Sequence, residues 1–185
     1  MKSTRFVFGR ALAVLCAILF VSFGFMSCQQ EDDGNELPDG VYELSDNSAL
    51  IGTWVNSYSG ETDVYRITSS TFDNSGTYSY STTSTYNSYA GNNLVVSYTN
   101  DAATSGYIYI KYTRAMNSDY SYSETAPDVG KWYAIAFKEL KASSVSLSGA
   151  YNASGKTSTE TLEEAISTFS IANGYFSYYS ECVKQ

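Results

Sequence analysis

Short runs in which apolar and polar residues alternate follow one another from residue 50 to the end of the chain. In one run, Ile108, Ile110 and Tyr112 fall on one face and Tyr109 and Lys111 on the other. A period of two is typical of a β-strand with one face in a core and the other more exposed. The same pattern predicts strands at 51–56, 62–68, 71–76, 94–99, 107–113, 132–140, 144–151 and 175–183, and 77–90 alternates among Ser, Thr and Tyr.

One short helix is predicted late in the chain. Thr161 and Glu164 have the spacing of a capping box, and Leu162, Ala165 and Phe169 fall on one face of a helix. About eight short strands at hairpin spacing with one such helix predict an all-β fold, either an antiparallel barrel or a sandwich. A closed barrel has the advantage that it leaves no exposed strand edge.

The first 27 residues have the pattern of an export signal. Lys2, Arg5 and Arg10 precede an apolar run over 11–25, and the small residue Ser27 follows it. A basic start, an apolar centre and a small residue at the cleavage point are typical of a secretory signal peptide. The run is about fifteen residues long, short of the ~20 that a membrane-spanning helix needs.

Cys28 follows the small residue directly, as in bacterial lipoprotein signals, where a cysteine thiol takes a diacylglyceryl group before cleavage. Two or three acyl chains give stable anchoring, at ~0.8 kcal/mol per buried CH₂. We therefore expect lipidation at Cys28 and an outer-membrane lipoprotein that faces the periplasm or the cell surface. The alternative is an ordinary secreted protein with a free cysteine near its start.

The domain organisation follows from composition. Residues 29–49 are polar, acidic and poor in apolar residues, as in a flexible tether. We therefore expect a signal peptide at 1–27, an acidic tether at 28–49 and one β-barrel domain at 50–185, which is long enough to bury a core.

Charge and composition exclude several classes of function. Cleavage after residue 27 removes three of the 11 basic residues and no acidic one, which leaves eight against 19 and a net charge of −11. Such a field repels nucleic acid. The chain has no histidine, which excludes His-containing catalytic triads and most zinc sites, and its carboxylates accompany no nucleophile. We expect no cofactor, no metal and no enzymatic activity.

Gly52-Thr53-Trp54, at the start of the first predicted strand, resembles the Gly-x-Trp opening of lipocalins and fatty-acid-binding proteins. In that fold the tryptophan closes one end of an eight-stranded barrel, often against an arginine from a later strand. Arg66 and Arg114 are the arginines that remain after cleavage, and the sequence leaves open which of them, if either, has this role. The resemblance implies an antiparallel, lipocalin-like (calycin-type) barrel.

More broadly, the chain resembles the lipocalin-like lipoproteins of spirochaetes. The resemblance lies in the lipidation signal, Gly52-Thr53-Trp54, the segment 126–133 and the tail 174–182. It implies a small apolar or amphipathic ligand but not the identity of that ligand. The predicted helix departs from the pattern, because it precedes the last strand, whereas the helix of typical lipocalins follows the final barrel strand.

Two hypotheses for function follow. In the first, a lipid-anchored barrel binds a small hydrophobic ligand in a cavity lined by apolar and aromatic side chains. The candidate ligand-contacting residues are Trp54, Tyr65, Ile108, Ile110, Tyr112, Trp132 and Phe137. For each of them, the ordinary role is that of a barrel core residue.

In the second hypothesis, the barrel is filled and acts as an interaction or adhesion module that contacts a host or envelope protein, or a glycan, through tyrosines. All 18 tyrosines follow residue 27, and tyrosine combines a large apolar ring with a polar tip. The candidate contacts are Tyr78, Tyr80, Tyr86, Tyr89, Tyr120 and Tyr122.

Overall fold

The computed structural model describes residues 36–79 and 82–185. The predicted signal peptide 1–27, Cys28 and the first part of the predicted tether lie outside the described residues. Within the described ranges, no helix combines the length and the apolar character that a membrane span requires.

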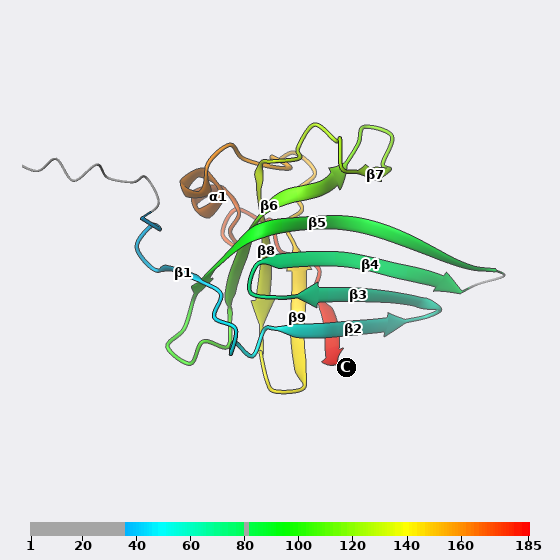
Figure 1. Cartoon of the computed structure of the whole chain (residues 1–185), viewed down its shortest axis with the longest axis horizontal. Coiled ribbons are helices and arrows are strands. Elements are labelled where there is room, and N and C mark those ends of the chain that lie inside the picture. Colours follow the sequence, from blue (N-terminus) through cyan, green and yellow to red (C-terminus); the bar gives the residue numbers. More distant parts are fainter. Residues whose placement is uncertain (1–35, 80–81) are drawn as a thin grey trace, which may run out of the picture. The chain divides into compact units, whose positions relative to one another are not determined.

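Eight antiparallel strands form a closed barrel, in which each of the eight pairs with the next along the chain (Figure 1). The last strand returns to the first through two residue pairs, Val183 with Val55 and Lys184 with Trp54. The eight strands are β2 (Gly52–Tyr58), β3 (Glu61–Ile67), β4 (Thr71–Ser79), β5 (Thr83–Tyr98), β6 (Gly106–Met116), β8 (Trp132–Lys138), β9 (Ser144–Gly149) and β10 (Ser180–Lys184). The predicted all-β antiparallel barrel is confirmed, and this meander is consistent with a calycin-like fold.

A short strand before the barrel corrects the predicted limits of the tether. β1 (Val41–Glu43) pairs with the last part of β5, and Val41 and Leu44 are buried. The end of the segment predicted as a tether, 28–49, therefore packs on the barrel. Its few apolar residues are separated by polar ones, so they give no periodic signal.

β5 is one continuous strand of 16 residues, although separate patterns at 77–90 and 94–99 were predicted for this part of the chain. Its pairing with β6 shifts register between Asn92 and Val95, which interrupts the alternation of faces. Gly91 is needed beside this irregularity, because a Cβ there would lie 2.6 Å from the Lys111 carbonyl oxygen. The strand bends along its length, so that it pairs with β4 at its start and with β1 at its end (Figure 1).

The centre of the barrel interior is a buried apolar core. Ile108 and Ile110 from β6, Ile135 and Phe137 from β8, and Trp54 from β2 are each at most 2% exposed. The alternation predicted for 107–113 is therefore correct, because every second side chain of β6 points inward. Packing of this kind gives the barrel its stability without a disulfide in the described residues.

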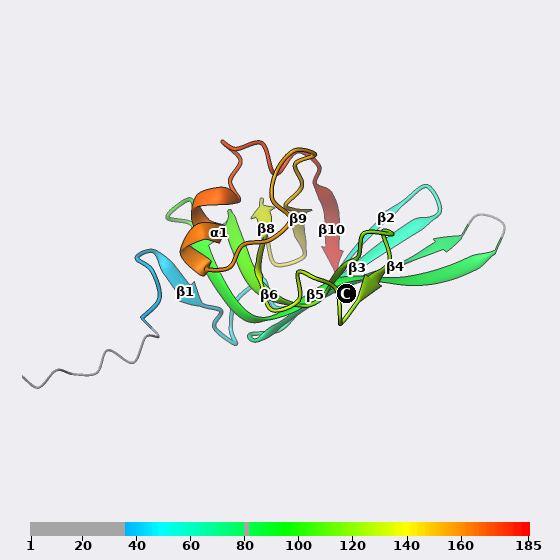
Figure 2. The same ribbon diagram turned by 90° about the horizontal axis from the view of Figure 1, so that it is seen from above.

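A second core lies on the outer face of β6 and β8. Tyr109, Ala134 and Ala136 point outward there, and the only helix in the described part of the chain, α1 (Leu162–Thr168), covers them with Leu162 and Phe169 (Figure 2). The alanines are small, so the helix can approach the sheet closely. Both faces of these two strands are therefore buried, which is why β8 reads as a nearly continuous apolar run.

The start of α1 agrees with the predicted cap. The Thr161 side chain accepts a hydrogen bond from the Glu164 backbone N–H at 3.2 Å. The predicted strand 175–183 begins only at Ser180, because Tyr175 and Phe176 are buried in the outer core instead of pairing in the sheet. α1 precedes the last barrel strand, as the sequence predicted.

We expect Phe169→Ala to lower the free energy of unfolding by about 3–5 kcal/mol, because it removes a large side chain from a packed site. Phe169 is fully buried, and its ring centroid lies 5.1 Å from that of Tyr175. Urea unfolding of this variant and of Tyr151→Ala, at a position that is 66% exposed, gives the comparison. A loss below about 1 kcal/mol in Phe169→Ala would show that the outer core contributes little.

Candidate functional site

Six of the seven predicted ligand-contacting residues lie together in the barrel interior. They are Trp54, Tyr65, Ile108, Ile110, Tyr112 and Phe137. Trp132 does not join them: it packs on the outer core, with Lys111 Nζ 5.5 Å from its ring centroid. Five positions separate Trp132 from Phe137, so the two side chains fall on opposite faces of β8. A ligand contact by any of the seven stays a prediction.

Trp54 is fully buried where β2 pairs with β10, and the cation beside it is a lysine. Lys184 Nζ from β10 lies 4.9 Å from the centroid of the Trp54 ring and donates to the Ala49 carbonyl oxygen at 3.2 Å. The Trp54 indole N–H donates to the Leu50 carbonyl oxygen at 2.7 Å. Gly52 has a φ of +144°, which residues with a Cβ rarely adopt, and a Cβ there would also lie 2.5 Å from Lys184 Cε. The glycine of the Gly-x-Trp motif therefore has a conformational reason in this chain.

Neither arginine pairs with that tryptophan. Arg114 binds Asp73 at 2.7 Å, and Arg66 lies 3.5 Å from the same carboxylate and donates to Ser75 Oγ at 2.8 Å. Arg114 also donates to the Ser88 carbonyl oxygen. This cluster joins β3, β4, β5 and β6, and its role in the barrel is structural.

Aromatic rings fill the part of the interior that begins at Tyr65, the β3 partner of Trp54. We call this part the tyrosine end and define it by Tyr65, Tyr89, Tyr112 and Tyr133. Tyr89 stacks on Phe72 with ring centroids 5.6 Å apart and meets Tyr133 edge-on at 5.2 Å. Tyr112 stacks on Tyr133 at 4.8 Å. Tyr89 is only half-buried, whereas the other three tyrosines are 7–8% exposed. Solvent therefore reaches the interior at this end.

Two hydroxyl groups of the tyrosine end, those of Tyr65 and Tyr133, form hydrogen bonds with groups outside the cluster. Tyr133 donates to the Ala150 carbonyl oxygen at 3.0 Å, and the hydroxyls of Tyr65 and Ser180 lie 3.1 Å apart. Burial raises the pKa of Tyr65, Tyr112 and Tyr133 above the usual value for tyrosine. Burial also raises the pKa of the nearby Cys182 thiol to about 12, so this cysteine is a poor nucleophile.

The interior face of the sheet continues past the barrel onto two hairpins, which we call the flap and define as residues 56–63, 76–79 and 82–86. In Figures 1 and 2 the ends of β2–β5 extend beyond the other strands. Tyr86 donates to Asp63 Oδ1 at 2.6 Å, and the rings of Tyr78 and Tyr86 stack with centroids 4.7 Å apart. Tyr58 is 77% exposed and Tyr78 is 39% exposed. The flap therefore carries an ordered and accessible set of tyrosines.

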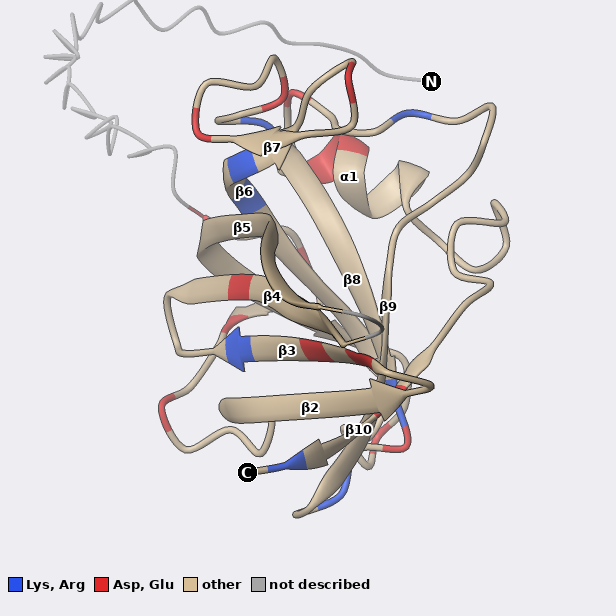
Figure 3. Ribbon diagram, turned by 90° about the vertical axis from the view of Figure 1, so that its right-hand side faces the viewer, with Lys and Arg blue, Asp and Glu red and all other residues tan. Residues whose placement is uncertain are grey.

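The charged side chains of the flap are acidic. Glu61 and Asp63 lie on β3 within it, and the flap sequence has no lysine or arginine. Figure 3 shows acidic positions near one end of β3 and a basic position near the other, in keeping with the order Glu61, Asp63 and Arg66 along the strand. The acidic pair lies on the same strand face as Tyr65, because the three positions alternate along β3.

The predicted surface tyrosines fall into different places. Tyr78 and Tyr86 lie on the flap, Tyr120 and Tyr122 lie on the hairpin that contains β7 (Tyr122–Ser123), and Tyr89 lies in the interior. Tyr80 lies outside the described residues. Sequence reasoning missed Tyr58, although the turn residues Ser59-Gly60 that follow it mark a hairpin tip.

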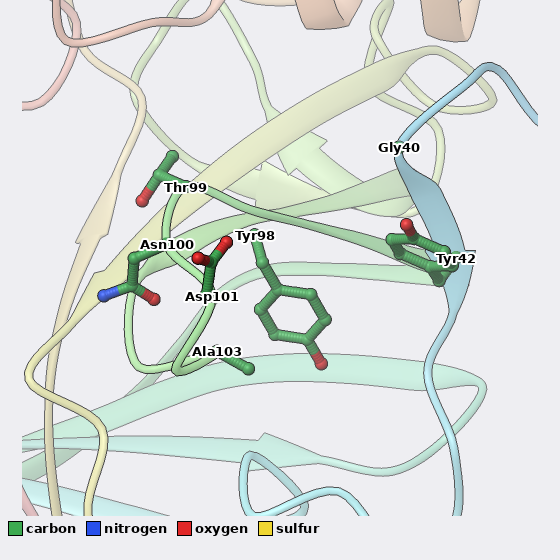
Figure 4. Close-up of a pocket in the computed structure, with 7 residues that line it drawn as sticks. All are labelled: Gly40, Tyr42, Tyr98, Thr99, Asn100, Asp101 and Ala103. Atoms are coloured by element: carbon green, nitrogen blue, oxygen red, sulfur yellow. The ribbon is translucent and has the colours of Figure 1, made fainter.

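An open pocket of about 490 Å³ lies at the other end of β5, between β1 and the loop that joins β5 to β6 (Figure 4). Its lining residues are Gly40, Tyr42, Tyr98, Thr99, Asn100, Asp101 and Ala103. None of them was a predicted site residue, because β1 was expected to be tether and the loop carries no motif.

Comparisons with known proteins found no family model that matches the chain and no curated protein or solved structure that is similar to it. The class that the fold defines is therefore the closed eight-stranded antiparallel barrel.

Raising the pH above about 10 is expected to destabilise the barrel. Tyrosine in an unfolded chain titrates near pH 10, and the pKa values of Tyr65, Tyr89, Tyr112 and Tyr133 are raised in the folded state. The unfolded state therefore loses protons first. Stability is complete below about pH 10 and falls as the pH rises toward the folded-state pKa values, by about 1.4 kcal/mol per pH unit for each such tyrosine.

Urea unfolding between about pH 8 and pH 11 measures this dependence. The variant Tyr112→Phe removes one of the titrating hydroxyls and should flatten the alkaline limb. A free energy of unfolding that does not change over this range would contradict the prediction.

Proposed function

We propose that this protein is a lipid-anchored binding module that contacts a partner protein of the envelope or of a host through the flap. The observation that supports this most directly is the continuation of the interior sheet face onto the flap. There Tyr58 and Tyr78 are exposed, and Tyr78 stacks on Tyr86. The filled barrel supplies a rigid support for this surface.

Two tyrosines of the flap, Tyr78 and Tyr86, are held by contacts within the flap. Tyr86 is fixed by its hydrogen bond to Asp63 and in turn supports the ring of Tyr78. A side chain that is already held in one rotamer loses little entropy on binding. Aromatic residues of this kind contribute a large share of the binding energy in protein interfaces.

The composition of the flap favours a protein partner. Its hairpins consist mainly of Tyr, Ser, Thr, Asn and Gly, with no exposed aliphatic residue among the described positions. Antibody binding loops use the same residue types, in which tyrosine supplies contact area and the small polar residues supply adaptable hydrogen bonds.

A small apolar or amphipathic ligand in the barrel is the second candidate function. The half-buried ring of Tyr89 favours a contact at the tyrosine end. Deeper in the interior, Trp54, Ile108 and Ile110 are fully buried, so a ligand would have to displace side chains that pack together. This packing is the reason we favour the flap over the interior.

The membrane anchor is part of the proposal. Attachment at Cys28 would hold the domain at the outer membrane, on the periplasmic face or the cell surface, where a binding module meets its partner. A binding role needs no catalytic group, and we propose no enzymatic activity.

Cys28→Ser is expected to abolish incorporation of labelled palmitate and to move the protein from the membrane fraction to the soluble fraction, because serine has no thiol to accept the diacylglyceryl group. Cys182→Ser is the matched control, since Cys182 is buried in the barrel core. Palmitate labelling that persists in Cys28→Ser would exclude lipidation at this position.

The double variant Tyr58→Ser/Tyr78→Ser is expected to weaken partner binding at least tenfold, since truncating a central interface tyrosine costs about 1–2 kcal/mol or more. Both side chains are exposed, so the fold should tolerate the change. The mature protein and the variant are incubated with envelope and host-surface extracts, and retained proteins are quantified. Tyr151→Ser changes an equally accessible tyrosine outside the flap and is the control.

Two results would contradict the flap proposal. One is retention of the same proteins by the double variant and the wild type. The other is saturable binding of a fluorescent fatty acid at about micromolar concentration, with the same affinity in the wild type and in the double variant. That result would place the function in the barrel interior instead.

A further inference from the structure

The pocket shown in Figure 4 is separate from the flap. Tyr98 ends β5, whereas Tyr86 lies near its start, about 40 Å away along the strand. The pocket volume of about 490 Å³ is in the range of small-molecule sites. Its ligand is therefore argued from its own lining residues and not from the proposed function.

Two aromatic rings form its apolar wall. The centroids of Tyr42 and Tyr98 are 6.4 Å apart, with their planes inclined by 32°. Tyr98 is held from behind by an edge-on contact with Phe137 at 6.0 Å, and Tyr42 is 56% exposed. Because the two centroids are this close, a cation in front of the rings can lie within about 6 Å of both of them, which is the range of a cation–π interaction.

The loop that forms the opposite wall is fixed by its own hydrogen bonds. Asn100 Nδ2 donates to Thr104 Oγ1 at 2.9 Å, and Asn100 Oδ1 accepts from the Thr104 N–H at 3.0 Å. The Thr99 N–H donates to the Ser105 carbonyl oxygen at 2.9 Å. The side-chain amide of Asn100 is therefore already occupied, and Asp101 is left as the charged group of the lining.

Asp101 supplies the charge of the pocket. Figure 4 shows Asp101 on the loop that lines one side of the pocket, and the pocket lining includes no lysine or arginine. Within the described residues, Asp101 forms neither an ion pair nor a side-chain hydrogen bond. The whole chain carries a net charge of −8, so the surrounding field also attracts cations and repels anions.

We propose that this pocket binds an organic quaternary ammonium ion. The methylated nitrogen lies against the faces of Tyr42 and Tyr98, and the Asp101 carboxylate provides the counter-charge. A quaternary ammonium ion has no N–H group that needs a hydrogen-bond acceptor. Two aromatic rings and one carboxylate are therefore sufficient to bind it, as in aromatic cages.

The test is a titration of the full protein with choline, followed by NMR chemical shifts. Its neutral carbon isostere, 3,3-dimethyl-1-butanol, has the same shape without the charge and is the matched ligand control. We expect saturable shifts at Tyr42, Tyr98 and Asp101 with choline and none with the isostere. Binding should weaken as the salt concentration rises.

Variants separate the contributions of the ring and the charge. Tyr42→Leu and Asp101→Asn are each expected to weaken choline binding about two- to fivefold, the range of a cation–π contact at an exposed site. Tyr151→Leu and Glu163→Gln remove an exposed tyrosine and an exposed carboxylate elsewhere and should change nothing. Equal binding of the isostere, absence of saturable shifts with choline, or unchanged affinity in both pocket variants would each overturn the proposal.

Discussion

The closure between β10 and β2 is the contact on which the rest of the structure depends. Only two residue pairs join these strands, Val183–Val55 and Lys184–Trp54, and Lys184 extends over the Trp54 ring in the space that Gly52 leaves. Without this contact, the apolar interior face would end at two open strand edges and be exposed to water. The buried apolar core therefore requires the last residues of the chain to pack against the first barrel strand.

A mismatch in strand length produces the flap. β4 has 9 residues and β5 has 16, but β9 has 6 and β10 has 5. β10 covers β2 only to Val55, and β6 covers β5 only from Ala90. The longer strands continue beyond these points as a sheet whose faces and edges are rich in hydroxyl groups and tyrosine. Short polar edges of this kind resist aggregation, and their backbone groups are available to a partner.

The sequence predicted the parts of the fold that repeat with a period of two. The alternation at Ile108 and Ile110 identified both the strand and its inward face, and Thr161 and Glu164 identified the start of the helix. β1 was missed because one three-residue strand among acidic residues has no period. Trp132 was grouped with Phe137 by residue type, although their spacing along the strand places them on opposite faces.

The sites could be predicted less well than the fold, for a physical reason. Tyr58, Glu61 and Tyr78 align across β2, β3 and β4 through strand register, and Tyr42 and Tyr98 meet through the pairing of β1 with β5. Neither arrangement is written in a local motif. The same register makes the two surfaces independent. Coupling between sites requires an element with two packed arrangements, and the interior between the two surfaces consists of buried, close-packed side chains. A partner at the flap should therefore leave the pocket beside β1 unchanged.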